Sequence, residues 1–463
     1  MRTALLRVGL LLGLLAACSS ATLDQETVMA TMVAATLQAQ VSPTDTGEPI
    51  DGEIQPQSVF GDCANSGQIS VAYLKDGNVW LWVRGAAPRQ LTHEGDAHDL
   101  RISGDACRIA YARAVANPGH DPAEDFPQPE TYSELWVVAS DGAGQQKLAG
   151  QEVFAAALAA PSGAVTGLHQ FEWQPGSRLL AFSTRQSFSG PGLLTSGDIH
   201  LVDADVPVPS LLLPAGQAGR FVFSPDGRQI AFASANRVGV VRTDGGDLRP
   251  GLVHFPAVIT YSEYQYEPPL FWTQAGDLIF ALPPEDMFAP PVDGLYPETV
   301  LWFVPLDGSA AFEAGAIQAV EFLQQEVAFS PDGGRIAYLR PQAASGEREL
   351  VIALSNGSHE SAWFNEADVL FGDWSPDNER FIYSFRDGDL RLIISDATGA
   401  LATPLDLPGL AEAPGVTVEW LNEDAVLVSL LGPSAQLFLW TTDGAVEFID
   451  AAGFGAAIYD AAD

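Results

Sequence analysis

The chain has 463 residues, and its 22 Lys and Arg against 59 Asp and Glu give a net charge of −37 at neutral pH. So acidic a protein repels nucleic-acid phosphates and anionic lipid surfaces, and we expect no nucleic-acid partner. Hydrophobic residues make up 47% of the chain and charged residues 17%, which is enough apolar material for a large core and excludes an intrinsically disordered chain.

The first residues have the pattern of a secretory signal. Two arginines precede the apolar run Val8 to Ala17, which is too short to span a bilayer. The tetrapeptide Leu-Ala-Ala-Cys that ends at Cys18 resembles the lipobox of bacterial lipoproteins, in which the cysteine is acylated and becomes the mature N-terminus. The resemblance implies a signal peptide at 1–17, lipidation of Cys18 and an extracytoplasmic protein anchored to a bacterial membrane, on its periplasmic or cell-surface side. An ordinary cleaved signal is the alternative.

Residues 18–57 lack strand patterning and contain the polar, Pro-containing segment Val41 to Pro49. We expect a flexible, lipid-anchored stalk that carries a globular body. Leu23 to Gln40 is compatible with a short helix, because Asp24 and Glu26 would lie in its first turn. A partner-binding helix is the alternative interpretation of this segment.

Two cysteines remain beside Cys18, namely Cys63 and Cys107, and they form a candidate disulfide in an oxidising compartment. A bond closing a loop of this length would add about 4 kcal/mol of stability in the chain-entropy model. Two buried free thiols are the alternative. No further sulfur or histidine ligands lie at a suitable spacing, so this pair does not predict a metal site.

One pattern recurs at Phe221 to Phe232, Val327 to Tyr338 and Gly372 to Tyr383, with Ser-Pro-Asp and then Gly or Asn between two apolar runs. Ser and Pro at the first two positions, with Gly at the fourth, are typical of a type I turn, so each copy predicts a hairpin. We expect the turn aspartates to accept backbone hydrogen bonds and to be structural. With a weaker copy at Leu100 to Tyr111, these are Asp105, Asp226, Asp332 and Asp377.

Weaker copies extend the series along the chain, and each has a second strand that serves as a reference point. The reference residues are Ala72, Ala110, Ala181, Ala231, Phe280, Ala337, Ile382 and Leu427. Most are 45 to 57 residues apart, close to the period of about 40 to 50 residues of a propeller blade. We therefore predict an all-β chain whose residues 58–463 form a β-propeller of four-stranded antiparallel blades.

Eight blades are expected, with seven as the alternative if one terminal repeat completes another blade. The first blade lacks a clear inner strand. Either Ser58 to Phe60 or the tail Phe454 to Tyr459 can supply it, and we favour the tail, which would join the two ends of the repeat region.

The Ser-Pro-Asp-Gly turn, the Ile-Ala-Phe/Tyr strand that follows it and the aromatic third strand resemble the WD-repeat-like β-propeller of TolB-type proteins. The resemblance covers Phe60 to the C-terminus. Such propellers also accompany serine peptidases of the prolyl-oligopeptidase type, whose separate hydrolase domain carries Gly-x-Ser-x-Gly. That pentapeptide does not occur in this sequence, so the resemblance implies no activity and we do not expect an enzyme.

Candidate ligand-binding residues lie in and beside long insertions, which are expected at Ala114 to Ser133, Gln186 to Asp198 and Pro283 to Thr299. A tyrosine-rich segment precedes one inner strand and offers stacking area and hydroxyl groups to a sugar or peptide. Core packing is the alternative role of these side chains. The candidates are Tyr261, Tyr264, Tyr266, Glu267, Phe288 and Tyr296.

The sequence predicts no metal and no cofactor. Seven histidines are scattered without a His-Glu-x-x-His segment, and the acidic residues Asp368, Asp373, Asp377 and Glu379 lack the spacing of an EF-hand. His169 is interpreted as an ordinary residue at a strand end, with a position facing the ring centre as the alternative.

The sequence is compatible with three alternative functions. The favoured one is a non-catalytic, extracytoplasmic, lipid-anchored propeller that binds a protein, peptide or glycan, or scaffolds an envelope assembly, as the TolB resemblance suggests. The alternatives are a hydrolase or lyase that uses a metal in the propeller mouth, and a structural spacer without a small ligand.

Overall fold

The computed structural model describes residues 68–125, 127–157, 164–188, 197–257, 259–260, 264–284, 286, 292, 295, 297–318, 327–341, 348–366, 368–397, 401–451 and 454–459. The chain divides into two units, Met1–Gln57 and Ser58–Asp463. The predicted signal peptide, Cys18 and the stalk lie outside the described residues, as does Cys63.

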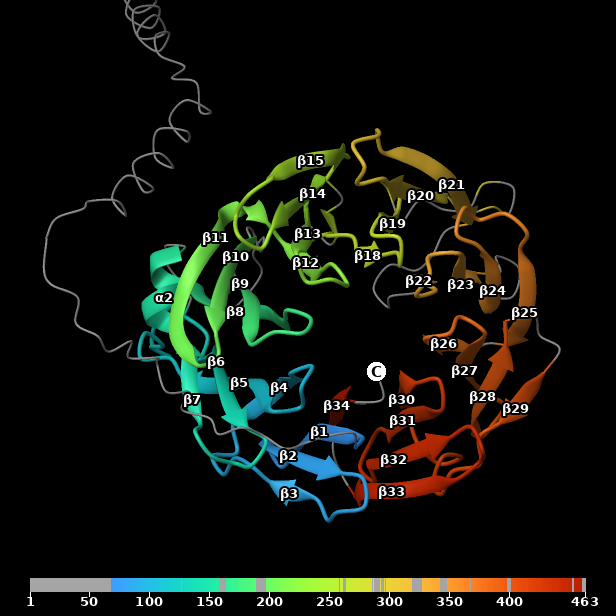
Figure 1. Ribbon diagram of the computed structural model, residues 1–463, viewed down its shortest axis with the longest axis horizontal. Helices are drawn as coiled ribbons and strands as arrows, with labels where there is room; N and C mark the ends of the chain where they lie inside the picture. The colour runs from blue at the N-terminus through green and yellow to red at the C-terminus, as the bar shows by residue number, and fades with distance from the viewer. Residues whose placement is uncertain are drawn as a thin grey trace, which may run out of the picture. The chain divides into compact units, whose positions relative to one another are not determined.

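The second unit is a β-propeller of eight four-stranded antiparallel blades, as Figure 1 shows, and the predicted fold is confirmed. Strands are given from the ring axis outward. Blade 1 consists of β34 (Phe454–Tyr459), β1 (Ser70–Lys75), β2 (Asn78–Val83) and β3 (Arg89–Gln90), and blade 2 of β4 (Ala97–Ile102), β5 (Arg108–Ala116), β6 (Thr131–Ala139) and β7 (Gln146–Ala149). Blade 3 consists of β8 (Ala164–Trp173), β9 (Leu179–Phe188), β10 (Gly197–Asp203) and β11 (Val206–Ala218), and blade 4 of β12 (Arg220–Phe223), β13 (Gln229–Ser234), β14 (Arg237–Arg242) and β15 (Arg249–His254).

The second half of the ring repeats the same order. Blade 5 consists of β18 (Phe271–Trp272), β19 (Leu278–Leu282), β20 (Glu298–Val304) and β21 (Phe312–Gln318), and blade 6 of β22 (Val327–Phe329), β23 (Arg335–Pro341), β24 (Arg348–Leu354) and β25 (Ser361–Glu366). Blade 7 consists of β26 (Leu370–Trp374), β27 (Arg380–Arg386), β28 (Leu390–Asp396) and β29 (Ala402–Pro404), and blade 8 of β30 (Val416–Asn422), β31 (Ala425–Leu430), β32 (Gln436–Thr441) and β33 (Val446–Ala451).

The second strand of each blade is the most buried part of the fold. All eight reference residues of the repeat lie in second strands, and each is at most 2% exposed. A second strand has a paired strand on either side and a neighbouring blade on each face, so both of its faces need apolar or small side chains. This explains why these strands gave the clearest repeat in the sequence.

The tail closes the ring. β34 pairs antiparallel with β1, with Ser70 opposite Tyr459 and Leu74 opposite Phe454, so the first blade takes its inner strand from the end of the repeat region. The prediction that favoured the tail is confirmed, and the ring has eight blades. Polar contacts reinforce the junction of blades 8 and 1, because Asp450 accepts a hydrogen bond from the Tyr73 hydroxyl at 2.6 Å and pairs with Lys75 at 2.7 Å.

The core of the propeller is divided into eight apolar clusters, one at each junction between neighbouring blades. At the junction of blades 8 and 1, for example, Tyr73 and Trp82 pack with Leu427 and Leu439. Each blade therefore buries its two faces against two neighbours, which a single hairpin unit cannot do alone. Closure stabilises the whole ring, because it buries the outer faces of the first and last blades.

Three local features depart from the sequence interpretation. Helix α2 (Gln151–Ala157) and the short pair β16 (Ile259–Thr260) and β17 (Tyr264–Gln265) were not predicted. The insertion expected at Ala114 to Ser133 is narrower, because β5 and β6 continue to pair as far as Ala116 opposite Thr131. The short Ala-Val-Ala sequence of this extension carries no local signal that separates strand from loop.

Strand direction gives the ring two different faces. We call the face on which the inner strands end in the Ser-x-Asp turns the turn face, and the face on which they begin the loop face. Because neighbouring strands are antiparallel, second strands end and third strands begin on the loop face. Each of the three predicted insertions lies between a second and a third strand, so the strands that flank it meet the loop face. The connection between β15 of blade 4 and β18 of blade 5, of which residues 258 and 261–263 are not described, also starts and finishes on the loop face.

Candidate binding site

The turn face is held by a repeated hydrogen-bond unit. In blade 4, the Ser224 hydroxyl donates to Asp226 at 2.6 Å, and Asp226 accepts the backbone N–H of Arg228 at 3.1 Å. Ser224 Oγ in turn accepts the backbone N–H of Gln229 at 2.9 Å. The same contacts recur at the other three predicted turns, formed by Ser103 with Asp105, Ser330 with Asp332 and Ser375 with Asp377.

The fourth turn position needs a positive φ, which Gly227 and Gly333 adopt at 68° and 73°. Ala106 and Asn378 take the same conformation in the other two copies, at 53° and 64°. A left-handed backbone is sterically unfavourable for residues with a Cβ, whereas Gly, which has none, adopts it freely. In each of the four turns the aspartate accepts a backbone N–H group of its own turn.

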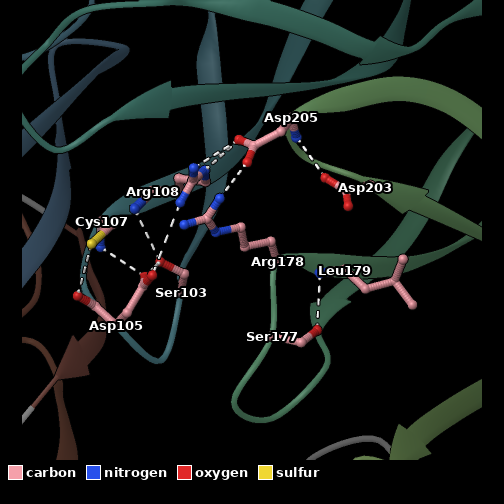
Figure 2. A network of polar contacts seen from close by, with 9 residues as sticks. All are labelled: Ser103, Asp105, Cys107, Arg108, Ser177, Arg178, Leu179, Asp203 and Asp205. Carbon is pink, nitrogen blue, oxygen red and sulfur yellow. Dashed lines mark hydrogen bonds and ion pairs between the residues drawn. The ribbon is translucent and has the colours of Figure 1, made fainter. Parts of the chain in front are cut away.

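An ion network joins blades 2 and 3 on the same face, as Figure 2 shows. The Arg108 side chain is 2% exposed, and its Nε and Nη2 donate to Asp205 Oδ1 at 3.1 and 2.7 Å. Arg178 binds the other oxygen of Asp205 at 2.7 Å. Cys107, beside Arg108, is disulfide-bonded. Its predicted partner Cys63 lies outside the described residues, so that pairing stays a prediction.

The loop face carries a different kind of cluster, in which titratable side chains from blade 3, blade 4 and the segment that joins blades 4 and 5 converge. It consists of His169 on β8, Arg185 on β9, Arg220 at the start of β12, and Tyr266 and Glu267 in the segment before β18, and we call it the Arg220 cluster. His169 and Arg185 are exposed, and the other three are half-buried. Members of the cluster come from residues almost 100 positions apart, and the closed ring brings them together.

Glu267 fixes the start of β12. Its Oε2 accepts the backbone N–H of Arg220 at 2.8 Å. A Cβ at Gly219 would lie 2.2 Å from the Ala233 carbonyl oxygen and 2.5 Å from Glu267 Oε1, so the position requires glycine. Burial raises the pKa of Glu267 above its usual value, and the hydrogen bond from Arg220 partly opposes this increase.

Gln170 joins the inner strands of blades 3 and 4. Its Nε2 donates to the Phe221 carbonyl at 2.7 Å, and its Oε1 accepts the Phe221 N–H at 3.3 Å. Nε2 also reaches Glu172 Oε1 at 3.0 Å. Inner strands present backbone groups without a strand partner towards the ring axis, and side chains of the preceding blade satisfy some of them. Glu172 is half-buried, and burial raises its pKa.

The charges around His169 favour its neutral form. Although part of His169 is open to solvent, the protein atoms around it lower its pKa to about 4, with further lowering by Arg185 and Arg220 and an opposing effect of Asp198. Asp198 itself is fully buried and accepts the Thr184 N–H at 2.6 Å and the Thr184 hydroxyl at 2.8 Å. His169 is therefore an uncharged hydrogen-bonding group at neutral pH.

A related contact joins blades 7 and 8. Asp373 on β26 accepts the backbone N–H groups of Trp374 at 2.9 Å and Trp420 at 3.1 Å. The pKa of Asp373 is raised to about 6. Burial is the main cause and the charge of Glu419 adds to it, while the two N–H groups act in the opposite direction. The acidic residues from Asp368 to Glu379 thus do not act together, because Asp373 and Asp377 serve different backbone groups.

The structure describes two of the six predicted ligand-binding side chains. Glu267 is in the Arg220 cluster, and Tyr266 joins it with a ring that packs against the apolar core between blades 4 and 5. The backbone of Tyr264 lies in β17, whereas Tyr261, Phe288 and Tyr296 lie outside the described residues.

Sequence reasoning missed Arg220 and Arg185, and it interpreted His169 as a strand-end residue although it lies within β8. An arginine next to glycine directly before the Phe-Val-Phe strand was the available signal for Arg220.

The described ranges contain neither a metal-binding cluster nor a membrane-spanning helix. Among these residues, no three His, Cys, Asp or Glu side chains lie close enough together to hold a metal ion. The described part of the chain also contains no helix that is long and apolar enough to cross a membrane.

Comparisons with known proteins add solved structures of similar fold. One is the β-propeller domain of the Trilobed protease from Pyrococcus furiosus, which has an open velcro topology; it is 13% identical with a TM-score of 0.43, covering 78% of this chain and 97% of that one. A second is described as the eukaryotic initiation factor, with 11% identity and a TM-score of 0.46 over 86% of this chain and 98% of that one. A third is the acylaminoacyl peptidase of Pyrococcus horikoshii, with 13% identity and a TM-score of 0.43 over 77% of this chain and 52% of that one.

No protein-family model matches the sequence, and no curated protein matches it. The resemblance to TolB-type propellers therefore stays an interpretation of the repeat motif.

Proposed function

We propose that this protein is a lipid-anchored, extracytoplasmic binding protein whose propeller holds a protein or peptide partner on the loop face. The lipobox-like sequence at Cys18 supports the anchor and the compartment. The Arg220 cluster supports binding, and it is the observation that carries the proposal.

The two faces of the ring differ in what their polar groups do. On the turn face, the Asp226, Asp332 and Asp377 carboxylates accept hydrogen bonds from their own turns. On the loop face, His169 and Arg185 are exposed, and they lie close to Arg220 of the next blade. Partly exposed groups with perturbed pKa values, gathered at one place on a rigid scaffold, are typical of binding sites.

The anchor is tested by replacing the acylated residue. Cells that express the full chain are labelled with an alkyne fatty acid, and the wild type is compared with Cys18→Ala. We expect the label and membrane association in the wild type and the loss of both in the variant. Unlabelled wild-type protein would contradict the anchor without affecting the binding site.

The binding face is tested by photo-crosslinking in intact cells. A photoreactive amino acid replaces His98, an exposed residue near the start of β4 on the loop face, or Arg228 in the turn of blade 4 on the turn face. We expect a discrete adduct from position 98 and none from position 228. Adducts from 228 alone, or from neither position, would contradict a partner on the loop face.

A further inference from the structure

The guanidinium of Arg220 stands out among the charged groups of the propeller. It makes no ion pair and no hydrogen bond with any residue that the structure describes, although it is half-buried. Arg108, Arg178 and Arg340, by contrast, each bind a carboxylate at 2.6 to 2.8 Å. Other arginines without a described acidic partner, such as Arg335 and Arg386, donate to backbone carbonyl groups instead.

The nearby acidic residues do not neutralise Arg220 by contact. One oxygen of Glu267 accepts the backbone N–H of Arg220, not a guanidinium N–H, and its second oxygen lies against Gly219. Glu172 is bound to Gln170 at 3.0 Å. The five N–H donors of the Arg220 guanidinium are therefore left for a ligand, within the described part of the site.

The groups around Arg220 are suited to a polar ligand with a single negative charge. His169 is uncharged at neutral pH, because burial and the two arginines lower its pKa to about 4. Burial also raises the pKa of Tyr266, so its hydroxyl keeps its proton. Both can hydrogen-bond to a ligand without adding charge.

We propose that Arg220 binds the carboxylate of a peptide ligand at the loop face. This inference rests on the proposed binding function and names the ligand class. A planar guanidinium matches a carboxylate with two parallel hydrogen bonds. A dianionic phosphate fits less well, because Glu172 and Glu267 lie near and the whole chain carries a charge of −37.

The position of Tyr266 favours a peptide over an acidic sugar. Sugar rings are bound on exposed aromatic faces, whereas the ring of Tyr266 packs into the core between blades 4 and 5 together with Leu270 and Phe280. The ring of Tyr266 therefore offers no stacking surface to a sugar.

The test compares peptides with and without a free carboxylate. The full chain in detergent is applied to an array of hexapeptides with free carboxyl termini, each paired with its C-terminally amidated twin, and hits are measured by fluorescence polarisation. We expect amidation of the peptide to weaken its affinity about tenfold or more, and we expect Arg220→Gln to weaken the affinity for the free acid to the same extent. Arg228→Gln, on the turn face of the same blade, is the matched control and should leave the affinity unchanged.

Each outcome decides the proposal. Amidated hits that depend on an internal Asp or Glu and on Arg220 support carboxylate recognition and identify a side chain as its source. Equal binding of acid and amide peptides without acidic side chains, full binding by Arg220→Gln, or the absence of any peptide hit overturns it. Binding of an oligogalacturonate alone would also overturn it, in favour of a glycan.

This test separates the ligand class from the function itself. If the peptide prediction fails while crosslinking from position 98 still captures a partner, the loop-face function stands and the role of Arg220 is wrong. If both fail, the proposed function fails as well.

Discussion

The ion network between blades 2 and 3 makes a quantitative prediction about ring stability. Asp205 binds both Arg108, whose side chain is 2% exposed, and Arg178, whose side chain is 49% exposed. In Asp205→Ala the Arg108 guanidinium stays buried, and Asp105 Oδ2 lies 3.9 Å from Arg108 Nη1, too far for a hydrogen bond. Breaking a buried ion pair from one side costs about 3 to 5 kcal/mol, and the remaining attraction of Asp105 places our expectation near the lower end.

Guanidinium chloride unfolding of the full chain, followed by tryptophan fluorescence, measures this loss. Arg178→Ala is the matched control, and we expect a loss of at most about 1 kcal/mol because that pair is largely exposed. Adding Arg108→Met to Asp205→Ala should recover part of the stability, since no buried charge then remains. An Asp205→Ala loss equal to that of Arg178→Ala would refute the role given to the buried pair.

Three further predictions concern the turns and the titrating groups. Gly333→Ala should destabilise the protein more than Gly276→Ala in the same unfolding assay. Both have a positive φ, but a Cβ at position 333 would also lie 2.6 Å from a threonine methyl group, whereas nothing lies within 4 Å at position 276. Asp373 should titrate near pH 6 by NMR; because its folded pKa is raised, the stability it contributes is present below about pH 4 and is lost as the pH rises through 6. A normal pKa near 4 would contradict this burial. His169 should titrate near pH 4 by NMR, and Arg220→Gln should raise that pKa; an unchanged value would show that the two side chains do not interact.

The repeat was readable from the sequence because each blade solves the same physical problem locally. Ala110 and Ala231 lie in second strands that are buried on both faces, so their neighbours must be apolar in every copy. The Ser224 to Asp226 turn likewise depends on contacts within a few residues. Such features recur in each blade at broadly similar intervals, and counting them predicts the number of blades.

The binding site was only partly readable, because it is made by blades rather than within one. The sequence directed attention to Tyr266 and Glu267, which lie beside an inner strand. It gave no reason to connect them with His169 or Arg185, which belong to blade 3 and approach Arg220 only through the packing of neighbouring blades. The packing of the Tyr266 ring into the core likewise depends on the position of blade 5.

Closure of the ring by the tail is the claim on which the two faces, and hence the site, depend. Ser70→Cys with Tyr459→Cys places two thiols on residues that are directly opposite in β1 and β34. Peptide mapping by mass spectrometry after mild oxidation should find the 70–459 disulfide within one chain, whereas Ser70→Cys alone should not form it. Failure of the double variant to form this bond while it remains folded would contradict an eight-bladed ring closed by its C-terminal strand.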